Sequence, residues 1–257
     1  MRRSMITGAI GYAAFSGFAL CAAAADLTPT YVPMQPIQPA SLTGGFYLGS
    51  VNAAAFPNHT SFDIGGGGAR VRSTYDTGFY SGLRVGYSFA PALWFTPRLE
   101  LEGGYGTQSV DAHTINGFRV NNGNSFGSTD IWQGYLNGYV DVNLASIFGA
   151  GRSFPAFTPY FGGGVGVANV NLSKQGVSAT GVVMNNDNTG FAYHLDAGIG
   201  VRLESLGLTN AFFQGTTLDI GYRYSDVPNL RFTAVDGTRS KTDFTANMVT
   251  IGFRKQF

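Results

Sequence analysis

The last ten residues of the chain alternate between apolar and polar side chains. Val249, Ile251, Phe253 and the terminal Phe257 are the apolar members, and polar or small residues lie between them. A strand with this period carries one apolar face and one polar face. In a closed membrane barrel, the apolar face meets lipid and the polar face lines the interior. The pattern predicts a final membrane-spanning strand, in which Phe253 and Phe257 form a C-terminal signal for the barrel assembly machinery.

The N-terminus has the layout of a secretory signal peptide. Arg2 and Arg3 precede an apolar run over residues 5–20, and small residues follow up to Ala25. Residues 1–25 are therefore predicted to be a signal peptide. An N-terminal anchor helix is the alternative, although the run is short of the ~20 residues that span a membrane. Residues 26–44 hold four prolines and are predicted to form an extended periplasmic leader.

The composition excludes several classes of protein. The chain has 37 glycines and 12% charged residues, where ordinary domains carry ~25% charged residues. A lipid-facing surface explains low charge, and a soluble glycine-rich β-sandwich is the alternative. Loss of Arg2 and Arg3 with the signal peptide leaves 14 basic and 15 acidic residues, which is not the balance of a nucleic-acid binder. Cys21 is the only cysteine, so a mature chain cleaved after it has no disulfide or cysteine metal site.

Residues 45–257 are predicted to form one all-β domain, an eight-stranded antiparallel transmembrane β-barrel. Eight segments alternate with a period of two, and each reaches the ~9–11 residues that a tilted membrane strand needs. They are Gly45–Phe56, Gly78–Phe89, Arg98–Val110, Ile131–Leu144, Thr158–Leu172, Gly190–Glu204, Thr216–Asp226 and Asp243–Phe257. The faces of the fifth segment are not assigned, because glycine dominates it. An even number of strands returns both ends of the barrel to the same side.

The connections between these segments differ in length and polarity. Long polar connections are predicted at 57–77, 111–129, 173–189 and 227–242, and generally shorter ones at 90–97, 145–157 and 205–215. Long outer loops and short periplasmic turns are typical of outer-membrane barrels. The four glycines at 65–68 are interpreted as a flexible outer loop. Aromatic residues gather at the short turns and predict an interfacial girdle; they are Trp94, Phe95, Phe154, Phe157, Phe212 and Phe213.

Charged side chains fall on the predicted inward face of the barrel. The predicted network consists of Arg84, Glu100, Glu102, Asp141, Asp196, Arg202, Asp219, Arg223 and Arg254, with Arg98 and Glu204 also inward. An eight-stranded barrel is just wide enough to be filled by side chains. Buried ions must be paired, so these residues predict an ion-pair network that plugs the lumen. The alternative is that the same charges line a narrow aqueous path.

The sequence offers little for catalysis. The three histidines are His59 and His113, in or beside predicted outer loops, and His194, which faces inward two residues before Asp196. No serine can be placed beside His194 as a nucleophile, and no metal-ligand spacing occurs. The chain is therefore expected to be no enzyme and to use no cofactor or metal. A lipid-modifying enzyme remains a third possibility, which loss of lipid turnover in His194→Ala would reveal.

Several stretches resemble the small outer-membrane immunogenic proteins, or porin-like β-barrels, of alphaproteobacteria. They are Gly44–Gly49 after the proline-rich leader, Thr158–Gly166, Asp219–Asp226 and the terminal Phe257, and the resemblance covers residues ~42–257. It implies an eight-stranded barrel in the cell outer membrane, with surface-exposed, antigenic loops. It implies roles in envelope integrity, surface contact or limited diffusion. Lys255 departs from the family pattern, which often has an apolar or aromatic residue there.

The leading hypothesis is a structural and surface-interaction barrel whose four outer loops bind any partner. The expected partners are outer-membrane lipid or lipopolysaccharide and a host or envelope surface molecule, but no nucleic acid. The runner-up is a narrow porin for passive diffusion of small solutes. Partner recognition usually occurs on loops that a rigid scaffold supports. A conductance measurement would distinguish the structural barrel from the porin.

Overall fold

The computed structural model describes residues 44–120, 122–148, 157–208 and 210–257. The predicted signal peptide, all of the predicted leader except Gly44, and Phe154 lie outside the described residues. No helix among the described residues is long and apolar enough to cross a membrane.

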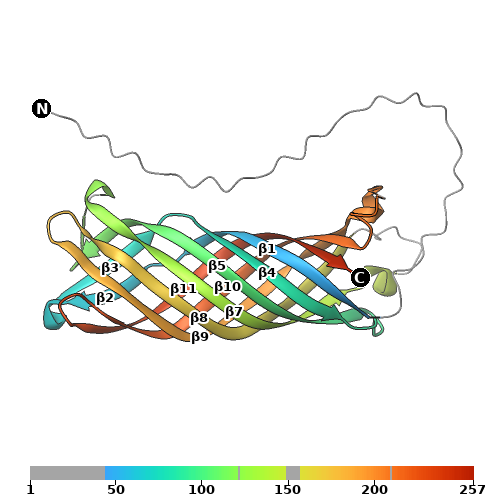
Figure 1. Cartoon of the computed structure of the whole chain (residues 1–257), viewed down its shortest axis with the longest axis horizontal. Coiled ribbons are helices and arrows are strands. Elements are labelled where there is room, and N and C mark those ends of the chain that lie inside the picture. Colours follow the sequence, from blue (N-terminus) through green and yellow to red (C-terminus); the bar gives the residue numbers. More distant parts are fainter. Residues whose placement is uncertain (1–43, 121, 149–156, 209) are drawn as a thin grey trace, which may run out of the picture. The chain divides into compact units, whose positions relative to one another are not determined.

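Eight antiparallel strands form a closed ring, and the predicted fold class is confirmed. They are β1 (Gly45–Pro57), β4 (Gly78–Ser88), β5 (Phe95–Ile115), β7 (Ser125–Val142), β8 (Phe157–Val177), β9 (Gly181–Arg202), β10 (Thr216–Thr233) and β11 (Arg239–Gln256). Neighbours along the ring pair in this order, and β1 pairs with β11 to close it. Figure 1 shows these long, tilted strands. Closure removes the unpaired strand edges that lipid could not satisfy.

Shorter elements lie at the two ends of the ring. Three strands join one end, namely β2 (Thr60–Ile64), β3 (Ala69–Tyr75) and β6 (Phe118–Arg119). Single turns of 3₁₀ helix occupy Gly65–Gly67, Asn122–Asn124 and Leu203–Leu206, and α1 spans Leu144–Phe148. We call the end with β2 and β3 the hairpin end and the end with the carboxyl terminus the terminal end (Figure 1).

The strands extend beyond the predicted segments, mainly toward the hairpin end. β5 continues to Ile115, β9 begins at Gly181 and β10 continues to Thr233. The long connections predicted from polar composition are therefore wrong in large part, because most of these residues are in strands. The connection 57–77 is a β-hairpin, in which β2 pairs with β3 and β3 with β5. The glycines at 65–68 form the tight turn of this hairpin, and Gly65–Gly67 all have positive φ.

The polarity of the barrel wall inverts along β11. Arg254 and Thr250 face inward near the terminal end, whereas Met248 and Phe244 face inward nearer the hairpin end. The outward positions change the opposite way, from Phe253, Ile251 and Val249 to Asn247, Thr245, Asp243, Lys241 and Arg239. The wall thus has an apolar exterior over a polar interior at the terminal end. At the hairpin end it has a polar exterior over an apolar interior, as in a soluble barrel.

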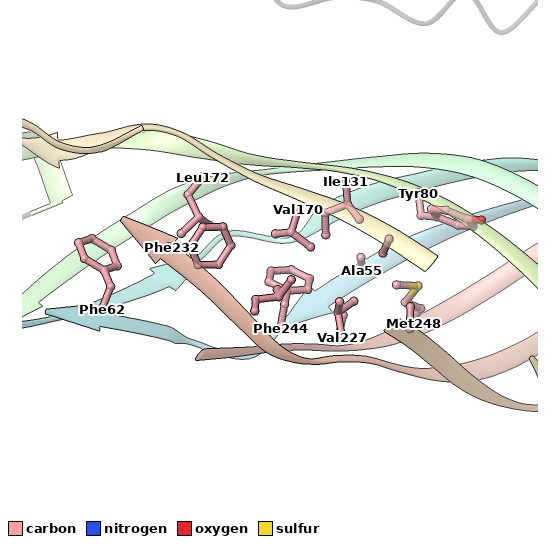
Figure 2. Close-up of a cluster of buried hydrophobic side chains, with 14 of the residues drawn as sticks. Ala55, Phe62, Tyr80, Ile131, Val170, Leu172, Val227, Phe232, Phe244 and Met248 are labelled. Atoms are coloured by element: carbon pink, nitrogen blue, oxygen red, sulfur yellow. The ribbon is translucent and has the colours of Figure 1, made fainter. Parts of the chain in front are cut away.

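An apolar core fills the interior at the hairpin end. Its buried members include Phe62, Val71, Ile131, Val170, Leu172, Met184, Val227, Leu230, Phe232, Phe244 and Met248. Figure 2 shows Phe62, Leu172, Phe232 and Phe244 in the space enclosed by the strands. Burial of one such side chain stabilises the fold by ~1.5–3 kcal/mol. This core explains why the strands remain paired in a region whose outer surface is polar.

A belt of polar side chains marks the level at which the exterior changes character. Hydrogen bonds join its members between neighbouring strands. The pairs are Asn52 with Ser81, Tyr105 with Asp130, Asn169 with Asp187, Tyr193 with Asp226 and Tyr222 with Asn247. Carboxylates are costly in hydrocarbon, so this polar belt places the edge of the lipid-facing band. The apolar exterior between the belt and the terminal end is the membrane-spanning part.

The predicted aromatic residues at the terminal end are found where they can meet an interface. Trp94, Phe157 and Phe212 are exposed, and the Trp94 ring lies 5.0 Å from that of Phe95. Tryptophan and other aromatic side chains are favoured at the level of the lipid head groups. Phe213 stacks edge-on against Phe212 in the turn before β10.

Candidate functional site

A network of buried charges crosses the lumen between the apolar core and the terminal end. We call it the ionic network. It consists of Arg84, Arg98, Arg223 and Arg254 with Glu100, Glu102, Asp141, Asp196 and Asp219. All are on the inward face of ring strands, where the period of two puts alternate residues. Glu100 is 1% exposed and Arg223 3% exposed, so the network is shielded from bulk water.

Arg223 of β10 pairs with carboxylates on two other strands. Its guanidinium donates to both carboxylate oxygens of Glu102, at 2.5 and 2.9 Å, and to both oxygens of Asp196, at 2.8 and 3.1 Å. Glu102 is on β5, which is four strands from β10 in either direction around the ring. The Arg223–Glu102 pair therefore spans the full width of the lumen. Bidentate guanidinium–carboxylate pairs are among the strongest hydrogen bonds in proteins.

Arg254 of β11 makes a second connection across the lumen. It donates to Asp219 at 2.7 and 2.9 Å and to Asp141 at 3.3 Å. Asp141 is on β7, opposite β11 in the ring. Arg84 adds a bond of 2.7 Å to Asp219, and the Arg98 Nε lies 2.9 Å from an Asp141 oxygen. Glu100 lies 3.8 Å from Arg98 and 3.9 Å from Arg84, so every carboxylate of the network has a guanidinium partner.

Tyrosines and one asparagine complete the network, and they were not among the predicted members. The Tyr47 hydroxyl donates to Glu100 at 2.9 Å, Tyr80 to Glu102 at 2.7 Å and Tyr139 to Asp196 at 2.5 Å. Asn137 Nδ2 donates to both Glu100 and Glu102, each at 3.0 Å. The inward positions of Tyr80, Asn137 and Tyr139 follow from the strand period, but their partners lie on other strands.

Two predicted members lie at the edge of the lumen. Arg202 is the last residue of β9, is half-buried and pairs in register with Thr217. Glu204 is in the turn after β9, where it accepts a hydrogen bond from the Gly215 amide. The prediction that Glu204 extends the inward face of that strand is wrong, because the strand ends at Arg202 and a 3₁₀ turn begins. The other eight residues of the predicted network are brought together, with Arg98.

His194 faces inward beside Asp196 as predicted, whereas the surroundings of His113 differ from those predicted. His194 Nε2 donates to Asn137 at 2.9 Å, and Nδ1 lies 3.2 Å from Asp196, so both ring nitrogens face the network. His113 is not in an outer loop but is fully buried in β5, 3.0 Å from the Ser73 hydroxyl. This serine–histidine contact is unsuited to nucleophilic catalysis, because Ser73 is also fully buried and inaccessible to a substrate. Only His59 is exposed.

The described residues contain no cluster of three or more histidine, cysteine or acidic side chains that could hold a metal ion. The acidic residues of the ionic network are instead occupied by arginines. The arrangement is one of paired charges that join opposite walls of the lumen.

Close approach of tyrosine rings to glycines allows the network to fit inside a narrow ring. A Cβ at Gly104 would lie 2.3 Å from the Tyr80 hydroxyl oxygen and 2.5 Å from its Cζ. We expect Gly104→Ala to displace Tyr80 from Glu102 and to destabilise the barrel by ~1–3 kcal/mol, as measured by the temperature of the heat-dependent gel shift. Gly103→Ala is the matched control, since no atom lies within 4 Å of its added Cβ. The double variant Gly104→Ala/Tyr80→Ala should destabilise the barrel by less than the sum of the two single changes. Strictly additive losses of stability would contradict a clash between the added methyl group and Tyr80.

The carboxyl terminus has the form expected of the predicted assembly signal. Phe253 and Phe257 are exposed on the outward face, and the Phe257 amide donates to the Phe46 carbonyl at 3.0 Å. Lys255, which departs from the resembling family, donates to the backbone carbonyls of Ala211, Phe212 and Gln214. Its ammonium is thereby paired at the terminal end, as expected of a lysine near the membrane interface. The role of these residues in assembly stays a prediction.

Comparisons with known proteins agree with the architecture. Residues 10–257 match the family described as the outer membrane protein beta-barrel domain. No curated protein matches the chain in sequence. Among solved structures, the outer membrane protein OprG from Pseudomonas aeruginosa is 16% identical, with 82% of this chain and 96% of that chain covered and a TM-score of 0.45.

Two other solved structures have similar scores. Neisserial surface protein A is 13% identical, with 83% of this chain and 97% of that chain covered and a TM-score of 0.43. The outer membrane protease OmpT from Escherichia coli is 6% identical, with the same coverage of 83% and 97% and a TM-score of 0.43. The family match extends over nearly the whole chain. The chain therefore belongs to the outer membrane protein beta-barrel domain family, and it is a protein of the cell outer membrane.

Proposed function

We propose that this chain is a closed structural barrel that supports the envelope and presents its hairpin end to the outside. The observation that carries the proposal is the pair of connections across the lumen, Arg223 to Glu102 and Arg254 to Asp141. An eight-stranded ring has little interior space beyond its own side chains. The ionic network occupies that space at the terminal end, and the apolar core occupies it at the hairpin end.

The differences between the two ends support an orientation with the hairpin end outside. The longer strand extensions and the β2–β3 hairpin belong to the hairpin end, whereas the turns before β5 and before β10 are at the terminal end. Outer-membrane barrels carry their larger structures outside and short turns in the periplasm. A hairpin end that faces outward would contact surface partners, which include neighbouring lipopolysaccharide and host or envelope molecules.

Single-channel recording tests whether the lumen is closed. The chain from residue 26 onward is refolded, its folding is checked by the heat-dependent gel shift, and it is inserted into a planar bilayer. We expect a folded barrel without discrete conductance steps, because paired charges and packed apolar side chains both exclude a continuous water path. Reproducible steps from the folded wild type would contradict closure and would favour the narrow porin.

A further inference from the structure

Five basic side chains form a strip on the outer wall of the hairpin end. We call it the basic strip. It consists of Arg70 and Arg72 of β3, Arg231 of β10, and Arg239 and Lys241 of β11. All five are exposed, and each faces away from the barrel interior, since its neighbours in sequence, such as Val71, Phe232 and Ser240, are buried. The strip is separate from the ionic network and from the apolar core.

The members of the basic strip lie on three strands, β10, β11 and β3, with β2 between β11 and β3. Arg231 stands opposite Lys241 in the β10–β11 register. β2 lies on the other side of β11, where Ser240 Oγ accepts from the Asp63 amide at 2.7 Å and Thr242 Oγ1 from the Ser61 amide at 3.4 Å. β3 follows, with Arg72 opposite Ser61 and Arg70 opposite Asp63. The strip therefore runs across three strand spacings, or ~14 Å.

Few acidic side chains pair with the basic residues of the strip. None of its five members takes part in a salt bridge among the described residues, in contrast to exposed Arg119, which lies 2.9 Å from Asp111. Asp63 is the only acidic residue of β2. Arg72 donates to the Nδ1 of His59 at 2.8 Å. Like charges directly opposite each other destabilise a sheet, so the Arg231–Lys241 pair is unfavourable without an anionic partner.

Two neighbouring acidic residues, Asp236 and Asp243, accept hydrogen bonds from backbone amides. Asp243 accepts a hydrogen bond from the Asn229 amide at 2.7 Å, and Asp236 accepts from the Gly65 and Thr238 amides at the hairpin turn. Partial burial and the Arg72 charge lower the pKa of His59, so its ring is neutral when it accepts from Arg72. The five basic side chains still outnumber the nearby Asp63, Asp236 and Asp243, so the strip has a net positive charge that a partner of opposite charge would complement.

The distance of the strip from the polar belt and the direction of its side chains limit which molecules can bind it. Six residues separate Asn247 of the polar belt from Lys241 along β11. At ~3.4 Å per residue and a tilt of ~40°, Lys241 lies ~15 Å beyond the belt. Its side chain faces sideways from the wall, parallel to the membrane plane. The molecules that stand beside an outer-membrane barrel at this height are the sugars of the surrounding lipid, whereas the lipid phosphates at the belt would meet Asp130, Asp187 and Asp226.

We propose that the basic strip binds the anionic sugars of outer-leaflet lipopolysaccharide, through their phosphate and carboxylate groups. Guanidinium groups bind these anions in a bidentate manner, and Arg70, Arg72, Arg231 and Arg239 supply four of them. The inference rests on the proposed orientation of the hairpin end but not on closure of the lumen. A conducting barrel would leave it intact.

The test is binding of lipopolysaccharide micelles to the refolded barrel in neutral detergent. Arg231→Gln/Lys241→Gln removes two charges from the strip, and Arg119→Gln/Lys174→Gln removes two charges from the same end outside it. We expect the strip variant to bind lipopolysaccharide with a phosphorylated core roughly tenfold or more weakly, and the control to bind like wild type. Added NaCl should weaken wild-type binding and narrow the difference. The heat-dependent gel shift verifies that both variants are folded.

Two further probes separate the source of the anion. Lipid A without core sugars should bind wild type and strip variant equally, because its phosphates lie below the strip. Equal binding of core-bearing lipopolysaccharide by the strip variant and the control would overturn the proposal, as would full strip-dependent binding of lipid A alone. Strip-dependent binding of a soluble sulfated polysaccharide in preference to lipopolysaccharide would also overturn it, in favour of a free polyanion from outside the membrane.

Discussion

Arg223→Ala is expected to destabilise the barrel by roughly 3–5 kcal/mol, because it leaves Glu102 and Asp196 buried without their guanidinium partner. Removal of one member of a buried ion pair costs far more than the pair contributes, since the remaining charge is uncompensated. The midpoint of unfolding in the heat-dependent gel shift should fall accordingly. Arg84→Ala should cost less, because Arg84 makes one close bond, to Asp219, at 2.7 Å.

The matched control for Arg223→Ala is Arg119→Ala, which breaks the exposed pair with Asp111. That change should cost less than ~1 kcal/mol, since surface ion pairs contribute little. Arg223→Met with Glu102→Gln and Asp196→Asn should restore much of the stability, because it removes the three charges together. If Arg223→Ala melts like Arg119→Ala, the ionic network does not stabilise the lumen. Conductance recorded on the same protein shows whether loss of Arg223 also opens a path.

The eight ring strands could be predicted from the sequence because lipid imposes a strict pattern. Residues such as Ile251 and Phe253 must alternate with inward polar residues wherever the exterior is hydrocarbon. The partners of the inward charges could not be predicted. Arg223 meets Glu102, which is 121 residues away and on the opposite side of the ring. That contact depends on the stagger of all eight strands, which alternation within one strand does not reveal.

The hairpin end was predicted wrongly because its strands also alternate with a period of two, but their apolar residues face inward and their polar residues face outward. Leu230 and Phe232 alternate with Asn229, Arg231 and Thr233, but the apolar residues face inward. The polar residues and glycines around them favoured a loop interpretation. The period-two alternation of Leu230 to Thr233 was the available signal, and it indicated a strand with water outside rather than lipid. Phe62 and Val71 lie in short segments, β2 and β3, of five and seven residues, so their contribution to a core was not apparent.

The apolar core should determine whether the hairpin end stays closed, and Phe62 is the residue that tests it. Phe62 is 1% exposed and anchors β2, which is joined to β11 mainly through side chains such as Ser240 and Thr242. We expect Phe62→Ala to destabilise this region by ~3–5 kcal/mol and to release the hairpin from the wall, since β2 pairs with β3 but has no strand pairing with β11 that could replace the lost packing. Limited trypsin digestion should then cleave after Arg70 or Arg72.

The ring itself should survive this change, because Phe62 is on β2, which is not a ring strand, and the ionic network lies nearer the terminal end than the apolar core. The expected result is therefore a nicked barrel that still shows the heat-dependent gel shift. Phe118→Ala is the matched control at the same end, since Phe118 is 82% exposed and its removal should leave the hairpin resistant to trypsin. Equal trypsin resistance of both variants would mean that the β3–β5 ladder alone holds the hairpin. Regions of a protein that are energetically independent unfold separately, whereas coupled regions unfold together. Loss of the gel shift in Phe62→Ala would therefore mean that the hairpin end and the terminal end of the barrel unfold as one unit.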